Sequence, residues 1–172
     1  MSAVLEHPSR LQRVIERAHT DIKIVDWSPQ FFDQALLIAR EMHAGSIYRD
    51  IPLDERKVLA QLAGAGTSRD PSRYFRIAVL NGEGLGGFYG SVHRAFFSDD
   101  LIANDMGWWV KREARNTLAA LLLLADFERW AREKGAKKVM VGQVTDVDVE
   151  RTTKLFEACG FRVVGMNAVK SL

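Results

Sequence analysis

The sequence predicts an α/β protein: a mixed, mainly antiparallel central sheet with helices on both faces. Residues 73–111 alternate between apolar and polar side chains and are broken by turn residues, which indicates three successive antiparallel strands. From residue 116 onward, helical periodicity alternates with short strand-like runs, which indicates strand–helix–strand units. Because a strand–helix–strand order usually joins parallel strands, those at 104–110 and 138–144 are expected to be parallel neighbours that diverge at their C-terminal ends.

Composition limits the possible functions. The chain has 172 residues, 47% hydrophobic and 27% charged, which suits one domain with a sizeable core. The net charge of +2, with basic residues scattered among acids, predicts no nucleic-acid partner. The longest apolar run, Leu118 to Ala125, is too short to cross a bilayer, so no membrane association is expected. A lone cysteine, Cys159, and no signal segment favour a cytoplasmic protein.

The first 20 residues are expected to form a helical arm, and residues 21–172 a single domain. Ser9 and Gln12 fit a capping box at the start of a helix over residues 9–19. Its apolar stripe consists of Leu11, Val14, Ile15 and Ala18. This arm either packs on its own domain or docks on a partner, including a second copy of the chain.

The next elements follow from capping and turn residues. Residues 22–27 favour a strand, and Ser28-Pro29 begins a helix to about Glu41, since serine caps helices and proline suits their first turn. A loop at 45–52 separates it from a second helix at 54–62.

Two features punctuate the rest of the chain. Asn81-Gly82 is a strong signal for a tight hairpin turn. Gly135 is a normal stop for the long amphipathic helix expected at 116–134. The other expected elements are strands at 73–80, 85–97, 101–111, 137–144 and 161–169, and a helix at 149–158.

A candidate anion site lies where the strand at 104–110 turns into the long helix. The first amides of a helix lack intrahelical partners, and the helix dipole favours negative charge there. Arg115 can add a charge-assisted contact to a phosphate, and the small Ala119 and Ala120 leave room for close approach. Taken alone, an arginine near a helix start is more often simply solvated.

In order along the chain, these residues resemble the GNAT N-acetyltransferase family. The family's cofactor pattern is a strand ending in valine, a turn, arginine or glutamine, two residues, glycine, one residue, and glycine or alanine. Here that pattern reads Val110, Arg115, Asn116, Thr117, Leu118, Ala119 and Ala120. The stretches Trp130–Ala136 and Leu155–Phe161 are similar to the end of the family's cofactor helix and to its C-terminal signature. Met42-His43, Ser46 and Tyr48 further resemble members carried by phages and prophages.

The resemblance covers about residues 21–172 and implies a co-substrate site for acetyl-CoA or another acyl-CoA. The pyrophosphate would lie over residues 115–120, and the backbone of Val110 would bond to the cofactor. The pantetheine arm would lie where the strand ending at Val110 splays away from the strand at 141–144. The implied activity is acyl transfer to an amine acceptor, a small molecule or a protein.

Two positions depart from the family pattern. Leu118 replaces the first glycine, which lets a backbone approach phosphate closely. Phe156 replaces a tyrosine that often protonates the departing thiolate, and phenylalanine cannot donate a proton. These departures keep a second interpretation open: a GNAT-shaped binding, structural or assembly module that has lost turnover.

Asp105 is the first candidate for the base that deprotonates the attacking amine. Period-two alternation puts it on one face with Gly107 and Trp109, opposite Met106, Trp108 and Val110. A purely structural hydrogen bond or ion pair for Asp105 is at least as compatible with the sequence. His93, on the neighbouring strand, could share or replace the role, although a strand histidine is more often structural.

The acceptor would be met by His43, Ser46 and Tyr48, whose loop borders the acceptor site in the family. A polar surface loop is the equally simple interpretation. No His/Cys cluster has metal-ligand spacing, so no metal is expected.

Overall fold

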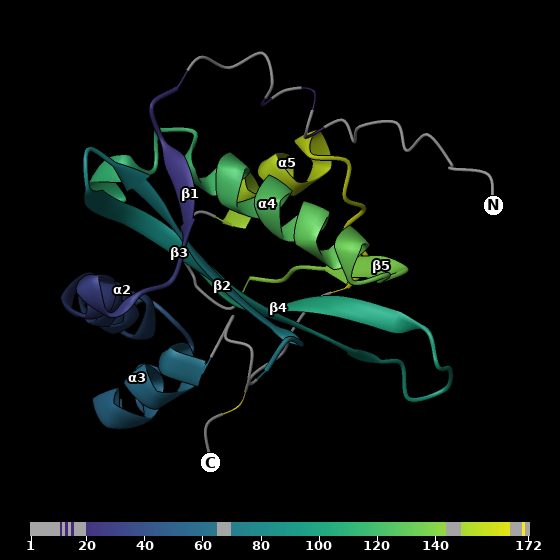
Figure 1. Cartoon of the computed structure of the whole chain (residues 1–172), viewed down its shortest axis with the longest axis horizontal. Coiled ribbons are helices and arrows are strands. Elements are labelled where there is room, and N and C mark those ends of the chain that lie inside the picture. Colours follow the sequence, from purple (N-terminus) through teal and green to yellow (C-terminus); the bar gives the residue numbers. More distant parts are fainter. Residues whose placement is uncertain are drawn as a thin grey trace.

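The computed structural model describes residues 11, 13, 15, 20–64, 70–143, 149–165 and 170. Its centre is a five-stranded sheet in the order β1-β2-β3-β4-β5 (Figure 1). The first three pairings are antiparallel, and β4 and β5 are parallel, as predicted. The strands are β1 (Lys23–Asp26), β2 (Arg73–Leu80), β3 (Glu83–Arg94), β4 (Leu101–Val110) and β5 (Lys138–Met140).

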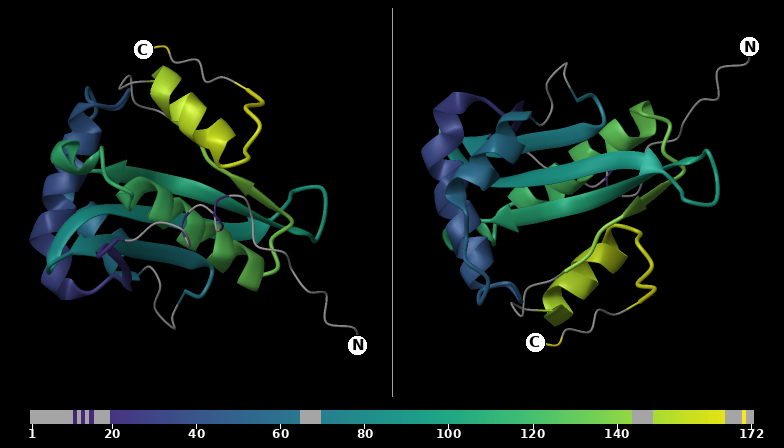
Figure 2. Two further views of the ribbon diagram at one scale, coloured as in Figure 1. Left: turned by 90° about the horizontal axis from the view of Figure 1, so that it is seen from above. Right: turned by 90° about the horizontal axis from the view of Figure 1, so that it is seen from below.

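Helices cover both faces of the sheet. Helices α4 and α5 lie on one face and α2 and α3 on the other (Figures 1 and 2), which confirms the predicted mixed architecture. The helical elements are η1 (Pro29–Phe31), α2 (Phe32–Ala44), α3 (Glu55–Gly64), η2 (Arg112–Ala114), α4 (Ala119–Glu133) and α5 (Val149–Ala158). The long helix starts three residues later than predicted, because residues 115–118, which follow η2, form turns and bends before the helix begins at Ala119.

Each face has its own apolar core. The α4 core centres on residues buried to 0% exposure, including Phe88, Leu123 and Phe127, whose rings and side chains pack between α4 and the sheet. A smaller core on the opposite face joins Phe31, Leu62, Phe75 and neighbours beneath α2 and α3. Gly90 permits the α4 core, since a Cβ there would lie 2.5 Å from the Phe127 ring.

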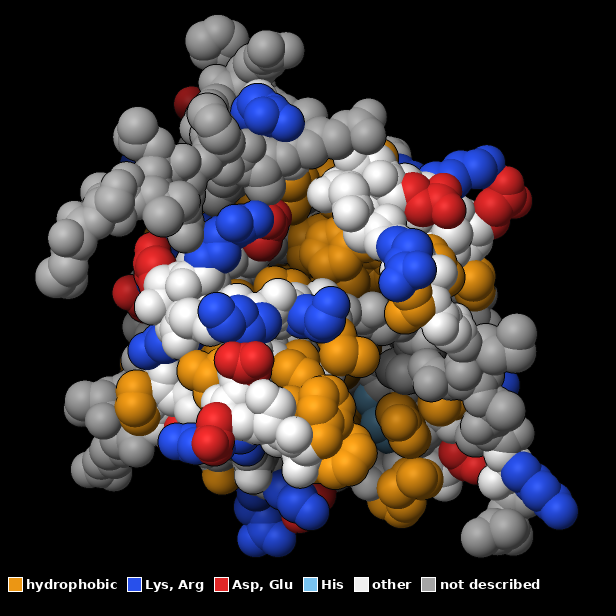
Figure 3. All heavy atoms as spheres, turned by 90° about the vertical axis from the view of Figure 1, so that its right-hand side faces the viewer, with side chains coloured by type: hydrophobic (Ala, Val, Ile, Leu, Met, Phe, Trp, Pro, Cys, Tyr) orange, Lys and Arg blue, Asp and Glu red, His pale blue; other side chains and the backbone are white. Residues whose placement is uncertain are grey.

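The hairpin turn between β2 and β3 is as predicted. Asn81 and Gly82 both have positive φ, 53° and 84°, which is what a type I′ turn requires. The opposite hairpin, between β3 and β4, projects from the body of the molecule. Hydrophobic side chains reach the surface on this side (Figure 3), where Phe96 and Phe97 are 98% and 74% exposed and pack edge to face.

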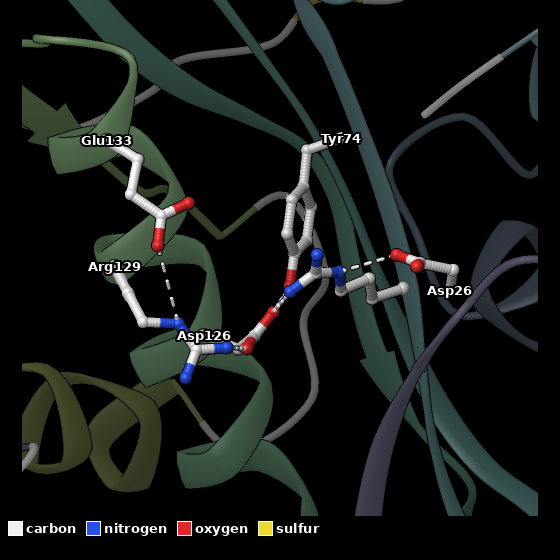
Figure 4. A network of polar contacts seen from close by, with 6 residues as sticks. Asp26, Tyr74, Asp126, Arg129 and Glu133 are labelled. Atoms are coloured by element: carbon white, nitrogen blue, oxygen red, sulfur yellow. Dashed lines mark hydrogen bonds and ion pairs between the residues drawn. The ribbon is translucent and has the colours of Figure 1, made fainter. Parts of the chain in front are cut away.

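A polar network fixes α4 on the sheet (Figure 4). The buried carboxylate of Asp126 accepts hydrogen bonds from Tyr74 Oη at 2.7 Å and Arg76 Nη1 at 2.6 Å, and also pairs with Arg129. Arg76 also donates to Asp26 on β1 at 2.8 Å. These bonds raise the pKa of Arg76 against the opposing effect of burial, so it stays charged and holds α4 across β2 and β1.

Two predicted strands differ from the structure. Residues 161–165 form no strand, while 166–169 of the expected final strand lie outside the described residues. The strand predicted at 137–144 ends at Met140; residues 141–143 leave the sheet, and Val144 is not described. Both segments are rich in valine, yet no neighbouring strand in the described chain pairs with them.

Only part of the predicted arm is described. Leu11, Arg13 and Ile15 are helical, and Leu11, 1% exposed, packs with Ile15 against the α4 core. Ser9, Gln12, Val14 and Ala18 lie outside the described residues. The described part of the arm therefore packs on its own domain, and docking on a partner stays a prediction.

In the described part of the chain, no helix is long and apolar enough to span a membrane. The same residues contain no group of three or more histidine, cysteine or acidic side chains that could hold a metal ion.

Candidate active site

A β-bulge in β4 decides where Asp105 points. Gly107 pairs with Tyr89, but the next pair is Asp105 with Gly90, so β4 carries one extra residue, Met106. Side chains beyond the bulge therefore change face. Gly90 faces α4, and its partner Asp105 does too.

The predicted alternation along β4 is consequently wrong at one point. Asp105 shares its face with Trp108 and Val110, which pack on the α4 core, whereas Trp109 packs on the opposite core. Regular period-two counting cannot anticipate this, because the bulge adds a residue that the pattern of apolar side chains does not mark.

The two parallel strands part next to Asp105. Pairing of β4 with β5 ends at Asn104 and Met140, while β4 continues to Val110. The predicted divergence is therefore confirmed. Beyond the last pair, Gly142 N–H donates to Asp105 Oδ1 at 3.0 Å, so the carboxylate bridges the opening between the strands. We call this opening the β4/β5 gap.

The environment of Asp105 suits proton transfer. Burial raises its pKa to about 6, against the hydrogen bond from Gly142 N–H, which lowers it. A base is most effective when its pKa lies near the working pH. Asp105 is therefore ionised at neutral pH but holds a proton more readily than an exposed aspartate.

Backbone groups of β4 face the same gap. Lys111 N–H donates to Leu85 O on β3 at 2.9 Å, whereas Val110 C=O points away from β3 and accepts from Arg115 Nε at 3.3 Å. Main-chain groups alternate in direction along a strand. Trp108 and Val110 thus direct their N–H and C=O groups to the β4/β5 gap, where an extended ligand can bond to them.

The entrance of α4 offers further donors. Leu122 N–H donates to Leu118 O at 2.9 Å and begins the hydrogen-bond ladder of α4, so the amides of Ala120 and Leu121 precede this ladder. Thr117 Oγ1 accepts from Ala119 N–H at 3.2 Å and donates to Ala114 O. Arg115, Asn116 and Thr117 are exposed, and Leu118 is half-buried.

Phe156 has an apolar role. It is 8% exposed, and its ring lies 5.8 Å from that of Trp108 and 6.1 Å from that of Phe161. The contact with Trp108 packs α5 against β4, which accounts for an aromatic residue at this position.

His93 is not brought together with Asp105. It is exposed near the end of β3, opposite Ile102. Val92 packs on the α4 core, so its neighbour His93 points to the other face.

Of the three acceptor candidates, His43 lies in the last turn of α2 rather than in the predicted loop, and Ser46 and Tyr48 lie in the loop that follows; their hydrogen bonds mainly hold this loop. His43 Nε2 lies 2.7 Å from Ile51 O, and the buried Ser46 hydroxyl donates to His43 O and accepts from Tyr48 N–H. Tyr48 is 49% exposed. The end of α2 lies close to β4, since the sulfur of Met42 would lie 3.8 Å from a Cβ on Gly107, so the loop that follows Ala44 begins near this part of β4.

Sequence reasoning missed two features of this region. Arg151 of α5 donates from Nη2 to Arg115 O at 3.3 Å and to Asn116 Oδ1 at 3.0 Å, although it is 35 residues from Asn116 in sequence. In addition, buried Asn104 Oδ1, Trp108 Nε1 and Trp109 Nε1 lack a hydrogen-bond partner within the described structure. In a sequence, a tryptophan on a strand is normally assigned to the apolar core. Neither periodicity nor residue spacing therefore predicts that these three polar atoms are buried without a partner.

A parallel strand pair that splays beside a helix N-terminus is an arrangement suited to an extended anionic ligand. The sequence matches the family described as Acetyltransferase (GNAT) family over residues 26–161. The chain therefore belongs to the GNAT acetyltransferase family, as its motifs indicated. No curated protein sequence gives a significant match.

Solved structures agree on the fold. AAC(6')-Iy, in complex with a CoA bisubstrate analogue of acetylneamine, superposes with a TM-score of 0.67 at 17% identity over 90% of this chain and 99% of that one. An aminoglycoside acetyltransferase, meta-AAC0020, from an uncultured soil metagenomic sample has a TM-score of 0.66 at 16% identity, covering 88% and 97%. A putative acetyl transferase from Pyrococcus furiosus has 0.65 at 21%, covering 88% and 99%.

Proposed function

We propose that this protein transfers an acetyl group from acetyl-CoA to a primary amine. The observation that carries the proposal is the position of Asp105: a half-buried carboxylate held by Gly142 N–H across the β4/β5 gap, with a pKa of about 6. The hydrogen bonds that lower its pKa come from two backbone amides, Gly142 N–H and its own, and they do not offset the effect of burial, so the carboxylate accepts a proton readily.

The acyl donor is proposed to bind along one continuous path. Arg115 and the amides of Ala120 and Leu121 would hold the pyrophosphate, as anions bind at helix N-termini. Asn116, Thr117, Leu118 and Ala119 complete that turn. The pantetheine arm would then follow the outward backbone of Val110 and Trp108 into the β4/β5 gap, ending with its thioester near Asp105.

Within this arrangement, each residue has a simple task. Asp105 takes the proton from the incoming ammonium, directly or through one water, so that a neutral amine attacks the thioester carbonyl. As the C–S bond breaks, the sulfur leaves as a thiolate, which needs no protein acid to depart. The attacking nitrogen gives up its second proton to solvent as the amide forms, and solvent protonates the thiolate, so Phe156 is no obstacle.

The acceptor would approach from the α2 side of the gap, past the loop of His43, Ser46 and Tyr48. Two of the similar structures are aminoglycoside acetyltransferases, so aminoglycosides belong in the first panel of amines to test, with polyamines and peptide N-termini. Thiol release from acetyl-CoA measures turnover. Acetylation of a panel amine that depends on Asp105 supports the proposal.

A second candidate function is supported by Leu118 and Phe156, both of which depart from the family pattern. Such a chain would bind acyl-CoA or a partner without turnover. Binding of acetyl-CoA with no transfer to any amine in the panel, and no slow hydrolysis, would favour this alternative.

A further inference from the structure

A row of side chains crosses the sheet at the point where the β4/β5 gap begins. The register joins its members from β2 across β3 and β4 to β5: Arg73, Ser91, Asn104 and Met140. Tyr74 and Val139, next to the two ends of the row, pack on the α4 core. Because side chains alternate along a strand, the row points to the opposite face, on which α2 and α3 lie. This is the face from which the acceptor amine is proposed to enter the gap.

The side chain of Arg73 reaches from β2 to the bulge in β4. Its Nη1 atom lies 2.6 Å from Met106 Sδ and 3.4 Å from Tyr89 Oη. Its guanidinium lies 5.9 Å from the centre of the Tyr89 ring, which attracts a cation and holds the side chain over β3. Met106 is the neighbour of Asp105 in the chain. The positive charge is therefore held at the residue that adjoins the proposed base.

The guanidinium of Arg73 contacts an acid on one edge and a thioether on the other. Asp70 Oδ2 lies 3.4 Å from Arg73 Nε, while Asp70 Oδ1 accepts from the Ser72 hydroxyl at 2.5 Å. On the other edge, Nη1 faces Met106 Sδ, and a thioether is only a weak hydrogen-bond acceptor. A carboxylate accepts bonds from a guanidinium that are roughly twice as strong as neutral ones, often two in parallel. A carboxylate at this edge would therefore displace the sulfur.

The surroundings favour an amine with one anionic group over a polycation. Met140 pairs with Asn104 across the strands, Met106 follows Asn104 by two residues along β4, and both methionines are about half-exposed. None of the four side chains of the row is acidic, and Asp70, beside its β2 end, already faces Arg73. Binding of a polycation favours several acidic groups, whereas an amino acid needs one cation for its carboxylate and one base for its amine.

We propose that Arg73 determines the acceptor specificity: it binds the carboxylate of an amino acid whose amine enters the β4/β5 gap beside Asp105. The two methionines would contact the rest of the amino acid. The nitrogen bonds to the acetyl carbon and CoA leaves as a thiolate, so the carboxylate takes no part in the bonds that change. This inference rests on the proposed function, because it names the acceptor class of that reaction. The competing explanation is that Arg73 only holds Asp70 and Tyr89 in place.

The test measures acetyl transfer to pairs of amines that differ only in the carboxylate. Each common amino acid is compared with its own carboxamide, and spermidine and an aminoglycoside serve as polycations. The proteins are the wild type, Arg73→Gln, which loses the charge but keeps a polar side chain, and Arg94→Gln as the matched control. Arg94 also pairs with an aspartate, Asp99, but it is the last residue of β3 and points to the α4 face, as Val92 does.

In the wild type, we expect at least one amino acid to be acetylated with a higher kcat/KM than its carboxamide and than either polycation. Arg73→Gln should lower kcat/KM for that amino acid by about 10–100-fold, as for one lost charge-assisted pair. It should leave kcat/KM for the carboxamide and the KM for acetyl-CoA nearly unchanged. The ratio of the two kcat/KM values is compared between proteins, so the different basicity of the two amines cancels. Arg94→Gln should keep the wild-type ratio.

An equal loss for the amino acid and its carboxamide, or no loss for either, would overturn the role of Arg73 while the proposed function stands. Transfer to spermidine or the aminoglycoside but to no amino acid would overturn the acceptor class, again without touching the proposed function. If the wild-type protein acetylates no amine of any class, the proposed function fails and this inference fails with it.

Discussion

Replacing Asp105 with asparagine should make the protein more stable and less active at the same time. Asparagine keeps the shape of the side chain and an oxygen that accepts the hydrogen bond from Gly142 N–H. It removes the negative charge that burial makes unfavourable. A residue kept only for structure would not show such a trade between stability and activity.

The size of the stability gain follows from the pKa. The pKa of Asp105 is about 6 in the folded protein, compared with about 3.9 in an unfolded chain. This pKa difference corresponds to a gain in the free energy of unfolding of the variant of at most about 3 kcal/mol. For a domain of this size, that gain raises Tm by roughly 6–12 °C.

The sign of the pH dependence is specific. Between about pH 4 and pH 6 the folded state binds more protons at Asp105 than the unfolded state, so the stability it contributes falls as pH rises. Below pH 4 the protonated wild type and Asp105→Asn should be equally stable. Above pH 6 the variant should be more stable by the full amount.

Denaturant unfolding of both proteins from pH 4 to pH 8 measures this difference directly, because the contributions of all other groups cancel. In the same preparations, acetyl transfer should fall by about 10²–10⁴-fold, while acetyl-CoA affinity stays nearly intact. If Asp105→Asn is less stable than the wild type at pH 7.5, or keeps full activity, Asp105 is not the catalytic base. If His93→Ala then abolished activity, the base would be His93.

Three further predictions concern the cofactor turn and the α4 network. Arg115→Ala should weaken acetyl-CoA binding by about 1.5–3 kcal/mol in calorimetry; unchanged affinity would remove Arg115 from the site. Leu118→Gly should improve affinity if the leucine crowds the phosphates, and little helix penalty is expected because Leu118 is the N-cap that precedes α4, where glycine is favoured over leucine; a weaker complex would show that Leu118 does not obstruct the phosphates. Asp126→Asn should lower the free energy of unfolding by about 1.5–3 kcal/mol, since it weakens the bonds from Tyr74 and Arg76. Glu133→Gln, at an exposed ion pair, is its control and should change stability little.

Local signals in the sequence were sufficient for most of the sheet. A two-residue type I′ turn requires positive φ at both central residues, and Asn-Gly is the pair that most readily adopts it. The β2–β3 hairpin could therefore be predicted from Asn81-Gly82 alone. The order of strand, helix and strand around α4 likewise predicted the parallel β4–β5 pair and the helix entrance at Arg115.

The details of the site depended on packing between distant residues. The bulge at Met106 decides to which face of the sheet Asp105 points. It pairs Asp105 with Gly90, which lies under the Phe127 ring, and no local sequence pattern marks the bulge. The contact of Arg151 with Asn116 depends on where α5 docks, which helical periodicity does not specify. The valine-rich segment at 161–165 reads as a strand, yet strand propensity forms no strand without a neighbour to pair with.

The most direct test of the central claim is a thermal-shift titration of the wild-type protein with acetyl-CoA, alongside Arg115→Ala. If acetyl-CoA binds at the β4/β5 gap, a concentration of one hundred times its dissociation constant should stabilise the wild type by about 2.7 kcal/mol, and the same concentration should stabilise the variant clearly less. No shift at millimolar acetyl-CoA, or an equal shift in both proteins, would contradict the account.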